Sequence, residues 1–114
     1  MMKKFPLLLA MSMFFVLPAL TSAKAEMDKR EAKAIMHENK CTKCHSETRT
    51  KTGPSLEKIA EKNKGKANAV DELIKQMTTG PMIKLEDGSQ EEHKIIDIKD
   101  PAKLKDLAEW ILSH

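Results

Sequence analysis

Apolar residues in the segment after residue 27 recur with the period of an amphipathic helix. Ala32, Ile35 and Met36 occupy positions i, i+3 and i+4, which places them on one helical face. Asp28 precedes this stripe as an N-cap residue, and Glu31 stands where a capping-box partner is expected. The pattern predicts a first helix that begins after Asp28 and runs into residue 41.

Three further helices are predicted by the same criteria. The second follows Ser55 as its N-cap and ends near Gly65. The third follows Asn68, with Asp71 at its third position, and the fourth follows Asp100, whose neighbouring proline suits a first helical turn. The inward-facing positions are Leu56, Ile59 and Ala60; Val70, Leu73, Ile74 and Met77; and Leu104, Leu107, Ala108 and Ile111.

Residues 82–99 separate the third and fourth helices and have no helical period. They contain Gly88, several charges and a polar stretch, so an irregular loop is expected. Residues 95–98 have the composition of a short strand, but the chain offers no obvious partner for it. The pattern as a whole predicts an all-α domain with three to five helices.

Residues 1–25 have the features of a secretory signal peptide. Lys3 and Lys4 precede an apolar run over residues 5–20, and Ala23 and Ala25 form an A-x-A cleavage site. Cleavage is expected after Ala25, with Ala23 as the second choice. The alternative is an uncleaved membrane anchor, although the run is shorter than the roughly 20 residues of a spanning helix. Export leaves one domain, residues 26–114, and places it in the periplasm.

Removing the signal changes the charge of the protein. The full chain carries a net charge of +3, with 20 basic and 17 acidic side chains. Residues 1–25 contain three lysines and no acid, so 17 basic and 17 acidic side chains remain. Tyrosine is absent and Trp110 is the single tryptophan. Neither charge nor aromatic content favours binding of nucleic acid.

The sequence Cys41-Thr42-Lys43-Cys44-His45 is the attachment pattern of a c-type haem. Each thiol forms a thioether with one porphyrin vinyl group, and the following histidine becomes the proximal iron ligand. A thioredoxin-like redox pair would need a surrounding βαβ pattern, and a zinc site would need two more ligands at suitable spacing. The export signal favours the haem interpretation, with one covalently bound haem c as the cofactor.

Residues 27–113 resemble the small class I c-type cytochromes. The resemblance rests on the CxxCH motif, on Gly53-Pro54-Ser55-Leu56, and on a final helix that contains Trp110. It implies a cytochrome c fold packed around the haem, in which the Pro54 carbonyl accepts a hydrogen bond from His45 and fixes its tautomer. It also implies that the first and last helices cross, where Ala32 or Met36 meets Trp110.

The sixth ligand is the point at which the sequence departs from that family. The family usually places a methionine there, but counting back 17 residues from Trp110 leads to His93, which also lies 52 residues after Cys41. His93 is therefore the preferred distal ligand, since imidazole is a common ligand of haem iron. Met82, at the start of the loop, is the alternative. An open site and the side chains of Met77, His37 and Lys84 are weaker alternatives.

The expected function is one-electron transfer between periplasmic redox partner proteins through a low-spin, six-coordinate haem. No nucleophile paired with a base is recognisable, so an enzyme is not expected. Basic residues near the attachment motif either steer an acidic partner or are ordinary solvated surface; they are Lys40, Lys43, Arg49 and Lys51. The alternatives are binding of small gases such as NO or CO and a role as the haem subunit of a larger oxidoreductase. Membrane association is expected only if the signal stays uncleaved, and the sequence leaves the oligomeric state open.

Overall fold

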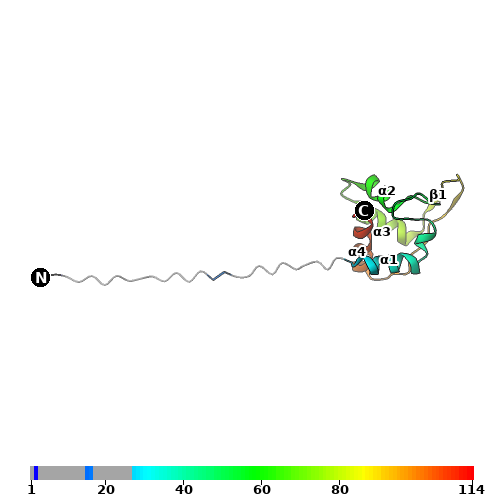
Figure 1. The fold of residues 1–114 in the computed structure, drawn as a ribbon. Coiled ribbons are helices and arrows are strands. Elements are labelled where there is room, and N and C mark those ends of the chain that lie inside the picture. The colour runs from blue at the N-terminus through cyan, green and yellow to red at the C-terminus, as the bar shows by residue number, and fades with distance from the viewer. Residues whose placement is uncertain (1, 3–14, 17–26) are drawn as a thin grey trace.

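The computed structural model describes residues 2, 15–16 and 27–114. The expected signal peptide and its cleavage site lie outside these residues, apart from Met2, Phe15 and Val16. The described chain forms four α-helices, one 3-10 turn and one β-hairpin (Figure 1). In chain order they are α1 (Lys29–Glu38), η1 (Cys41–Lys43), α2 (Leu56–Asn63), α3 (Ala69–Thr79), β1 (Met82–Lys84), β2 (Gln90–Glu92) and α4 (Pro101–Leu112).

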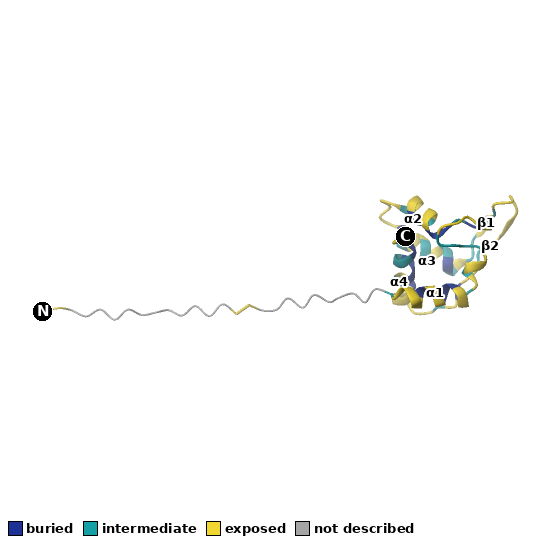
Figure 2. Ribbon diagram, viewed as in Figure 1, coloured by how far each residue is buried: buried dark blue, intermediate teal, exposed yellow. Residues whose placement is uncertain are grey.

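Helix α4 is the centre of the fold, because it packs against α1, α2 and α3. Its residues Leu107 and Ala108 are completely buried, as is Ala32 on α1. Figure 2 colours the ribbon by burial, and each of the four helices carries buried residues. Trp110 is partly buried and packs against the cluster that contains Ala32 and Met36. The helical class and the inward faces predicted from the sequence are confirmed.

Three of the four predicted N-caps are made by side chains. Asp28 accepts from the Arg30 backbone amide, Ser55 from Lys58, and Asp100 from Ala102. The other local expectations differ in detail. Glu31 does not serve chiefly as a capping partner but forms an ion pair with Lys103 of α4 at 3.0 Å. Asn68 occupies the N-cap position of α3, but its side chain makes no capping bond.

Helix α1 ends three residues before the position expected from the sequence. Asn39 is its C-cap, and Lys40 follows with a left-handed backbone at φ 60°. A left-handed residue ends a helix because it turns the chain away from the helix axis. The first cysteine therefore begins a separate 3-10 turn, η1, and does not continue α1.

The prediction of an irregular loop over residues 82–99 is wrong for its first half. Strands β1 and β2 form an antiparallel hairpin in which Met82 pairs with Glu92 and Lys84 with Gln90. Residues 85–88 form its turn, in which the Gly88 amide donates to the Leu85 carbonyl at 3.0 Å and Gly88 has φ +87°. A turn followed by a left-handed glycine is a common hairpin connection. The strands are short and mostly exposed, so they lack the alternation that reveals a strand in a sequence. Residues 95–98, considered as a short strand, form none.

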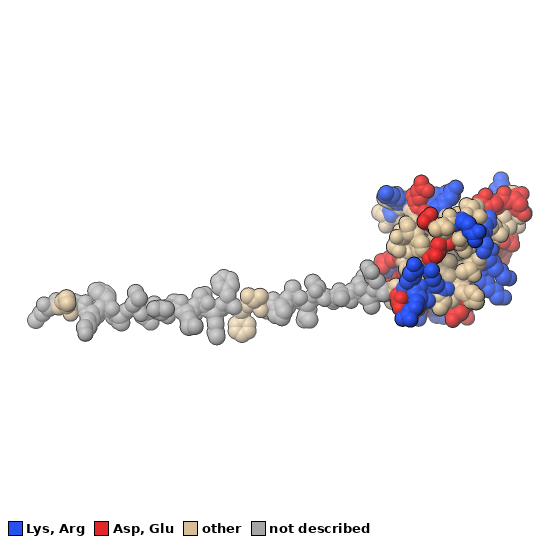
Figure 3. All heavy atoms as spheres, viewed as in Figure 1, with Lys and Arg blue, Asp and Glu red and all other residues tan. Residues whose placement is uncertain are grey.

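The surface of the domain mixes both signs of charge. Basic and acidic side chains are interspersed on the face drawn in Figure 3, in keeping with their equal numbers outside the signal segment. Within the described residues, no helix has the length and apolar character needed to cross a membrane.

Candidate functional site

Residues 41–45 form one tight turn that brings two thiols and an imidazole together. The backbone amides of Cys44 and His45 both donate to the Cys41 carbonyl, at 3.2 and 3.0 Å. The side chain of Lys51 stabilises the turn from outside, because its Nζ donates to the Thr42 carbonyl at 2.8 Å. The turn therefore presents the two cysteines and the histidine from a single short loop.

The His45 ring is held by the segment that follows it. Backbone amides of Gly53 and Leu56 donate to the carbonyls of Cys44 and Ser46, both at 2.9 Å. This pairing places the Pro54 carbonyl 2.6 Å from His45 Nδ1. A carbonyl oxygen only accepts, so Nδ1 carries the proton and donates. In the neutral tautomer with its proton on Nδ1, Nε2 is the ring nitrogen that can bind a metal ion.

Gly53 lies close to the same ring. A Cβ atom at this position would lie 3.1 Å from His45 Cε1, which is closer than ordinary van der Waals contact. The absence of a side chain thus lets the backbone approach the edge of the imidazole. The glycine of the Gly53-Pro54 pair leaves room for the ring, and the proline supplies its hydrogen-bond acceptor.

His93 occupies the segment that follows the hairpin. Its backbone amide donates to the Pro81 carbonyl at 2.9 Å, which continues the strand register by one pair. Its Nδ1 donates to the Lys94 carbonyl at 2.9 Å. This contact favours the tautomer that carries its proton on Nδ1. Burial lowers the pKa of the His93 imidazole, and the nearby His45 ring adds to this effect. Hydrogen bonds to the backbone of Lys94 and Gln76 oppose it, but the net direction is downward, so the neutral form is favoured.

The two imidazoles lie near each other although 47 residues separate them in the sequence. Their ring centres are 6.3 Å apart and their planes are tilted by 45°. A metal–imidazole bond is about 2 Å long, so two rings on opposite sides of one metal ion have centres about 6 Å apart. The observed separation is compatible with one metal ion between His45 and His93.

Met82, the alternative distal residue, lies on the other face of the hairpin. It pairs with Glu92, whereas His93 continues the register opposite Pro81. Side chains of neighbouring residues in a strand point to opposite faces, so Met82 and His93 diverge. The Met82 side chain is also 61% exposed. Of the weaker candidates, Met77 lies in the core, while His37 and Lys84 are exposed.

The described part of the chain matches known proteins over nearly its whole length. Residues 30–114 match the profile of the family Cytochrome c. The chain belongs to the cytochrome c family. A solved structure, the class 1 cytochrome MtoD from Sideroxydans lithotrophicus ES-1, is 47% identical, with a TM-score of 0.69; the match covers 72% of this chain and 90% of that one. Among curated protein sequences, none matches this cytochrome. It is a small monohaem class I c-type cytochrome, and its general function is haem-based electron transfer.

Haem c is the cofactor of this family, and the residues of the turn fit it. Cys41 and Cys44 are both free thiols, so neither is committed to a disulfide. Burial raises the pKa of the Cys41 thiol, which indicates that this sulfur lies in an apolar environment suited to a porphyrin edge. An open groove of about 540 Å³ borders His45 on the side of α1, where Met36, Leu56 and Trp110 lie among charged side chains. Its lining includes neither cysteine nor His93, so it is distinct from the space between the two histidines.

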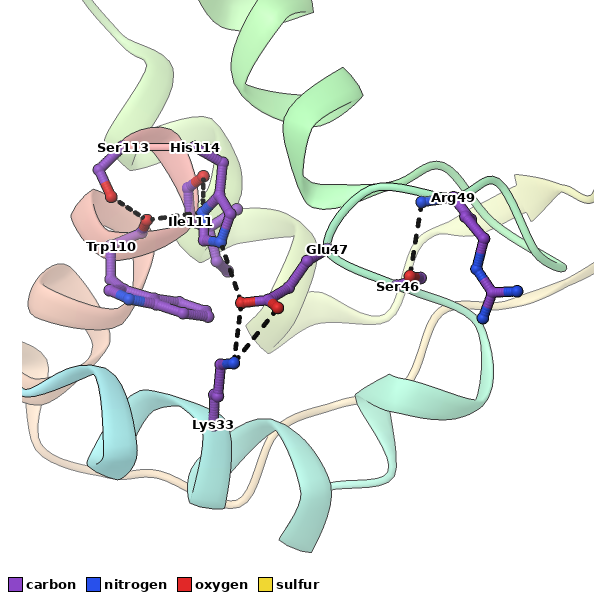
Figure 4. Close-up of polar contacts among 8 residues, drawn as sticks. All are labelled: Lys33, Ser46, Glu47, Arg49, Trp110, Ile111, Ser113 and His114. Atoms are coloured by element: carbon purple, nitrogen blue, oxygen red, sulfur yellow. Dashed lines mark hydrogen bonds and ion pairs between the residues drawn. The ribbon is translucent and has the colours of Figure 1, made fainter.

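A polar network ties the segment after His45 to the helices. Glu47 accepts from Lys33 Nζ at 3.2 Å, and His114 Nε2 lies 3.7 Å from the same carboxylate (Figure 4). The Lys33 hydrogen bond is the main reason why the pKa of Glu47 is lowered. His114 also stacks edge-on against Trp110, with ring centres 4.6 Å apart. The network therefore joins α1, the proximal segment and the end of α4.

Sequence reasoning missed the residues that act through long-range contacts. Glu47 and His114 belong to this group, and so does Asn39, whose side chain accepts from the Asp97 amide at 2.8 Å. The Lys94 carbonyl, which holds His93, was also missed. Every histidine is followed by a backbone carbonyl, so the sequence does not show which one its ring will bind. The contact between Asn39 and Asp97 spans 58 positions and leaves no local pattern in the sequence.

Proposed function

We propose that this cytochrome carries single electrons between periplasmic proteins, with His45 and His93 as the two axial ligands of a low-spin, six-coordinate haem c. The observation that supports it is the 6.3 Å separation of two imidazoles whose Nδ1 atoms are both engaged with carbonyls. A neutral imidazole that donates from Nδ1 has the tautomer that a metal ligand requires, and both contacts favour it. No chemistry on a substrate is needed.

The chain contributes a rigid pair of ligands. When bound, the haem supplies a one-electron couple between ferric and ferrous iron. The Pro54 and Lys94 carbonyls hold the two imidazoles in orientation. Two imidazole ligands lower the potential relative to an imidazole and a thioether, so the potential is expected below that of a His/Met cytochrome.

The proposed location rests on residues 1–25, which direct export and are then removed. Docking of an acidic redox partner is assigned to the basic side chains near the attachment turn; these are Lys40, Lys43, Arg49 and Lys51. Electron-transfer contacts are small, and charge steers them mainly through the association rate. Electron transfer to the partner should therefore slow as the ionic strength rises.

Absorption spectra of the purified holoprotein test the ligand pair. We expect low-spin spectra in both oxidation states, without the weak far-red band that marks methionine sulfur on ferric haem. His93→Ala should open the iron, so that the ferrous protein binds CO rapidly. His37→Ala removes an exposed histidine of α1 and serves as the matched control, with unchanged spectra.

Two results would contradict the proposal. A far-red band that is lost in Met82→Ala, but kept in His93→Ala, would assign the distal position to methionine. Rapid CO binding by the unmodified ferrous protein would replace the closed carrier with a gas-binding protein, because a firmly held distal ligand must leave before CO binds.

A further inference from the structure

Three backbone amides hold the segment that carries His93, and each donates to a different part of the fold. The His93 amide donates to Pro81 at the base of the hairpin, and the Ile96 amide donates to Met77 on α3 at 2.8 Å. The Asp97 amide donates to the Asn39 side chain at 2.8 Å. This third bond links the segment directly to the C-terminal end of α1, next to the cysteine turn.

The Asn39 side chain is fully used by this arrangement. Its Nδ2 donates to the Ile35 carbonyl at 3.0 Å, and its Oδ1 accepts from Asp97. Exchanging the amide oxygen and nitrogen would set N–H against N–H, so the network fixes the orientation. The bond to Ile35 is partly buried and the bond to Asp97 lies at the surface. Asn39 stands two residues before Cys41. One end of its amide thus anchors in α1, and the other holds the His93 segment.

We propose that Asn39 is a positioning residue for the distal ligand: it fixes the His93 segment relative to the turn that carries Cys41 and His45. The inference rests on the proposed His45/His93 ligation. Asn39 touches neither histidine in the contacts described above and acts through the backbone of Asp97. Without this bond the segment keeps its hydrogen bonds to α3 and to Pro81, but it loses the hydrogen bond to the end of α1, next to the turn that carries His45. His93 then leaves the iron more often.

Asn63 provides a matched control for the local part of this contact. It is the last residue of α2, and its Nδ2 donates to the Ile59 carbonyl at 2.8 Å, the same four-residue contact that Asn39 makes with Ile35. Both asparagines are partly buried. For the residues described, no hydrogen bond joins Asn63 to the 93–97 segment. Asn63→Ala therefore removes a helix-end side chain without releasing that segment.

The experiment measures CO binding to the ferrous holoprotein and hydrogen exchange at the Asp97 amide. Since CO binds only when the distal ligand has left, its binding rate reports how often His93 is dissociated. Asn39→Ala should raise this rate about two- to ten-fold over Asn63→Ala, the effect of one neutral hydrogen bond. The Asp97 amide should lose protection in Asn39→Ala and keep it in Asn63→Ala.

Asn39→Asp separates positioning from general stability. An aspartate keeps an oxygen for the Asp97 amide but has no N–H for the Ile35 carbonyl, and its charge is unfavourable at a helix C-terminus. The variant should unfold more easily than the unmodified protein but bind CO at nearly the unmodified rate. If the rate of CO binding instead rises as the unfolding free energy falls across Asn39→Ala, Asn63→Ala and Asn39→Asp, the positioning role is wrong.

The remaining outcomes are equally decisive. If Asn39→Ala loses Asp97 protection but binds CO no faster than Asn63→Ala, the inference is overturned and the proposed ligation stands. If His93→Ala itself leaves CO binding unchanged, the ligation is wrong and the inference falls with it. If Asn39→Ala yields no holoprotein, Asp97→Pro removes the donor N–H from the other side of the bond, and the same comparison of rates applies.

Discussion

Gly80 offers a direct measurement of how tightly the His93 segment packs against the end of α3. It is the C-cap of α3 and has a left-handed backbone at φ +59°. A Cβ atom there would lie 3.0 Å from Ile95 Cγ1 and 3.1 Å from the His93 carbonyl oxygen. The Ile95 side chain is 54% exposed and can move aside, but the carbonyl moves only with the segment.

Gly65→Ala is the control for Gly80→Ala. Gly65 also has positive φ, at +78°, but nothing lies within 4 Å of its added Cβ. A left-handed backbone costs an alanine about 1–2 kcal/mol at either position. Gly80→Ala adds overpacking, which costs about 1–3 kcal/mol in a tight site. We therefore expect Gly80→Ala to lose about 1–3 kcal/mol more unfolding free energy than Gly65→Ala.

Denaturant unfolding of the ferric holoprotein, followed by circular dichroism, gives both free energies by linear extrapolation. The rate of CO binding by the ferrous form is the second readout. If the His93 segment is displaced, the Gly80→Ala protein should bind CO faster than the unmodified protein, whereas Gly65→Ala should not. Equal losses of stability, within about 0.5 kcal/mol, would refute the reasoning. They would mean that the segment moves aside at no cost and does not hold His93 in place.

Three further predictions concern the core, a surface ion pair and the attachment motif. Leu107→Ala should lower the unfolding free energy by about 2–5 kcal/mol in denaturant titrations, since Leu107 is 0% exposed and its removal leaves a cavity. The hydrogen bond and charge of Glu31 raise the pKa of Lys103, so this pKa is higher in the folded than in the unfolded protein. The ion pair therefore stabilises the fold at neutral pH, and this stabilisation is lost as the pH rises through the folded-state pKa. Glu31→Gln should accordingly lower the unfolding midpoint slightly at pH 7, and the difference should disappear in strongly alkaline solution. Replacing both Cys41 and Cys44 by serine should abolish covalent attachment, so that acid–acetone extraction removes any haem and denaturing gels show no haem-stained band.

Much of the helical structure could be predicted because its signals are local. The stripe on α3 and the caps at Asp28, Ser55 and Asp100 involve residues within a few positions of each other. The hairpin was missed for the opposite reason. Its strands bury little, so backbone pairing across the turn at residues 85–88, and not an apolar face, holds them together. A polar segment of this kind has the composition of a loop even when it is paired.

The sequence by itself determined the chemistry of attachment. Two thiols and a histidine lie within five residues, so a single local turn is enough to bring all three to one porphyrin. It also determined which helical faces turn inward, since periodicity is a local property. These features needed no knowledge of how the helices pack.

Only the tertiary structure decided what lies opposite His45. The strand register sends Met82 and His93 to different faces, and that register depends on pairing across a turn. In the folded domain the centres of the His93 and His45 rings lie 6.3 Å apart, and the Asp97 amide donates to the Asn39 side chain. The spacing to Trp110 and Cys41 favoured His93 but left Met82 open. Contacts such as Asn39 with Asp97 depend on where distant segments meet after the core has packed, and they leave no local pattern in the sequence.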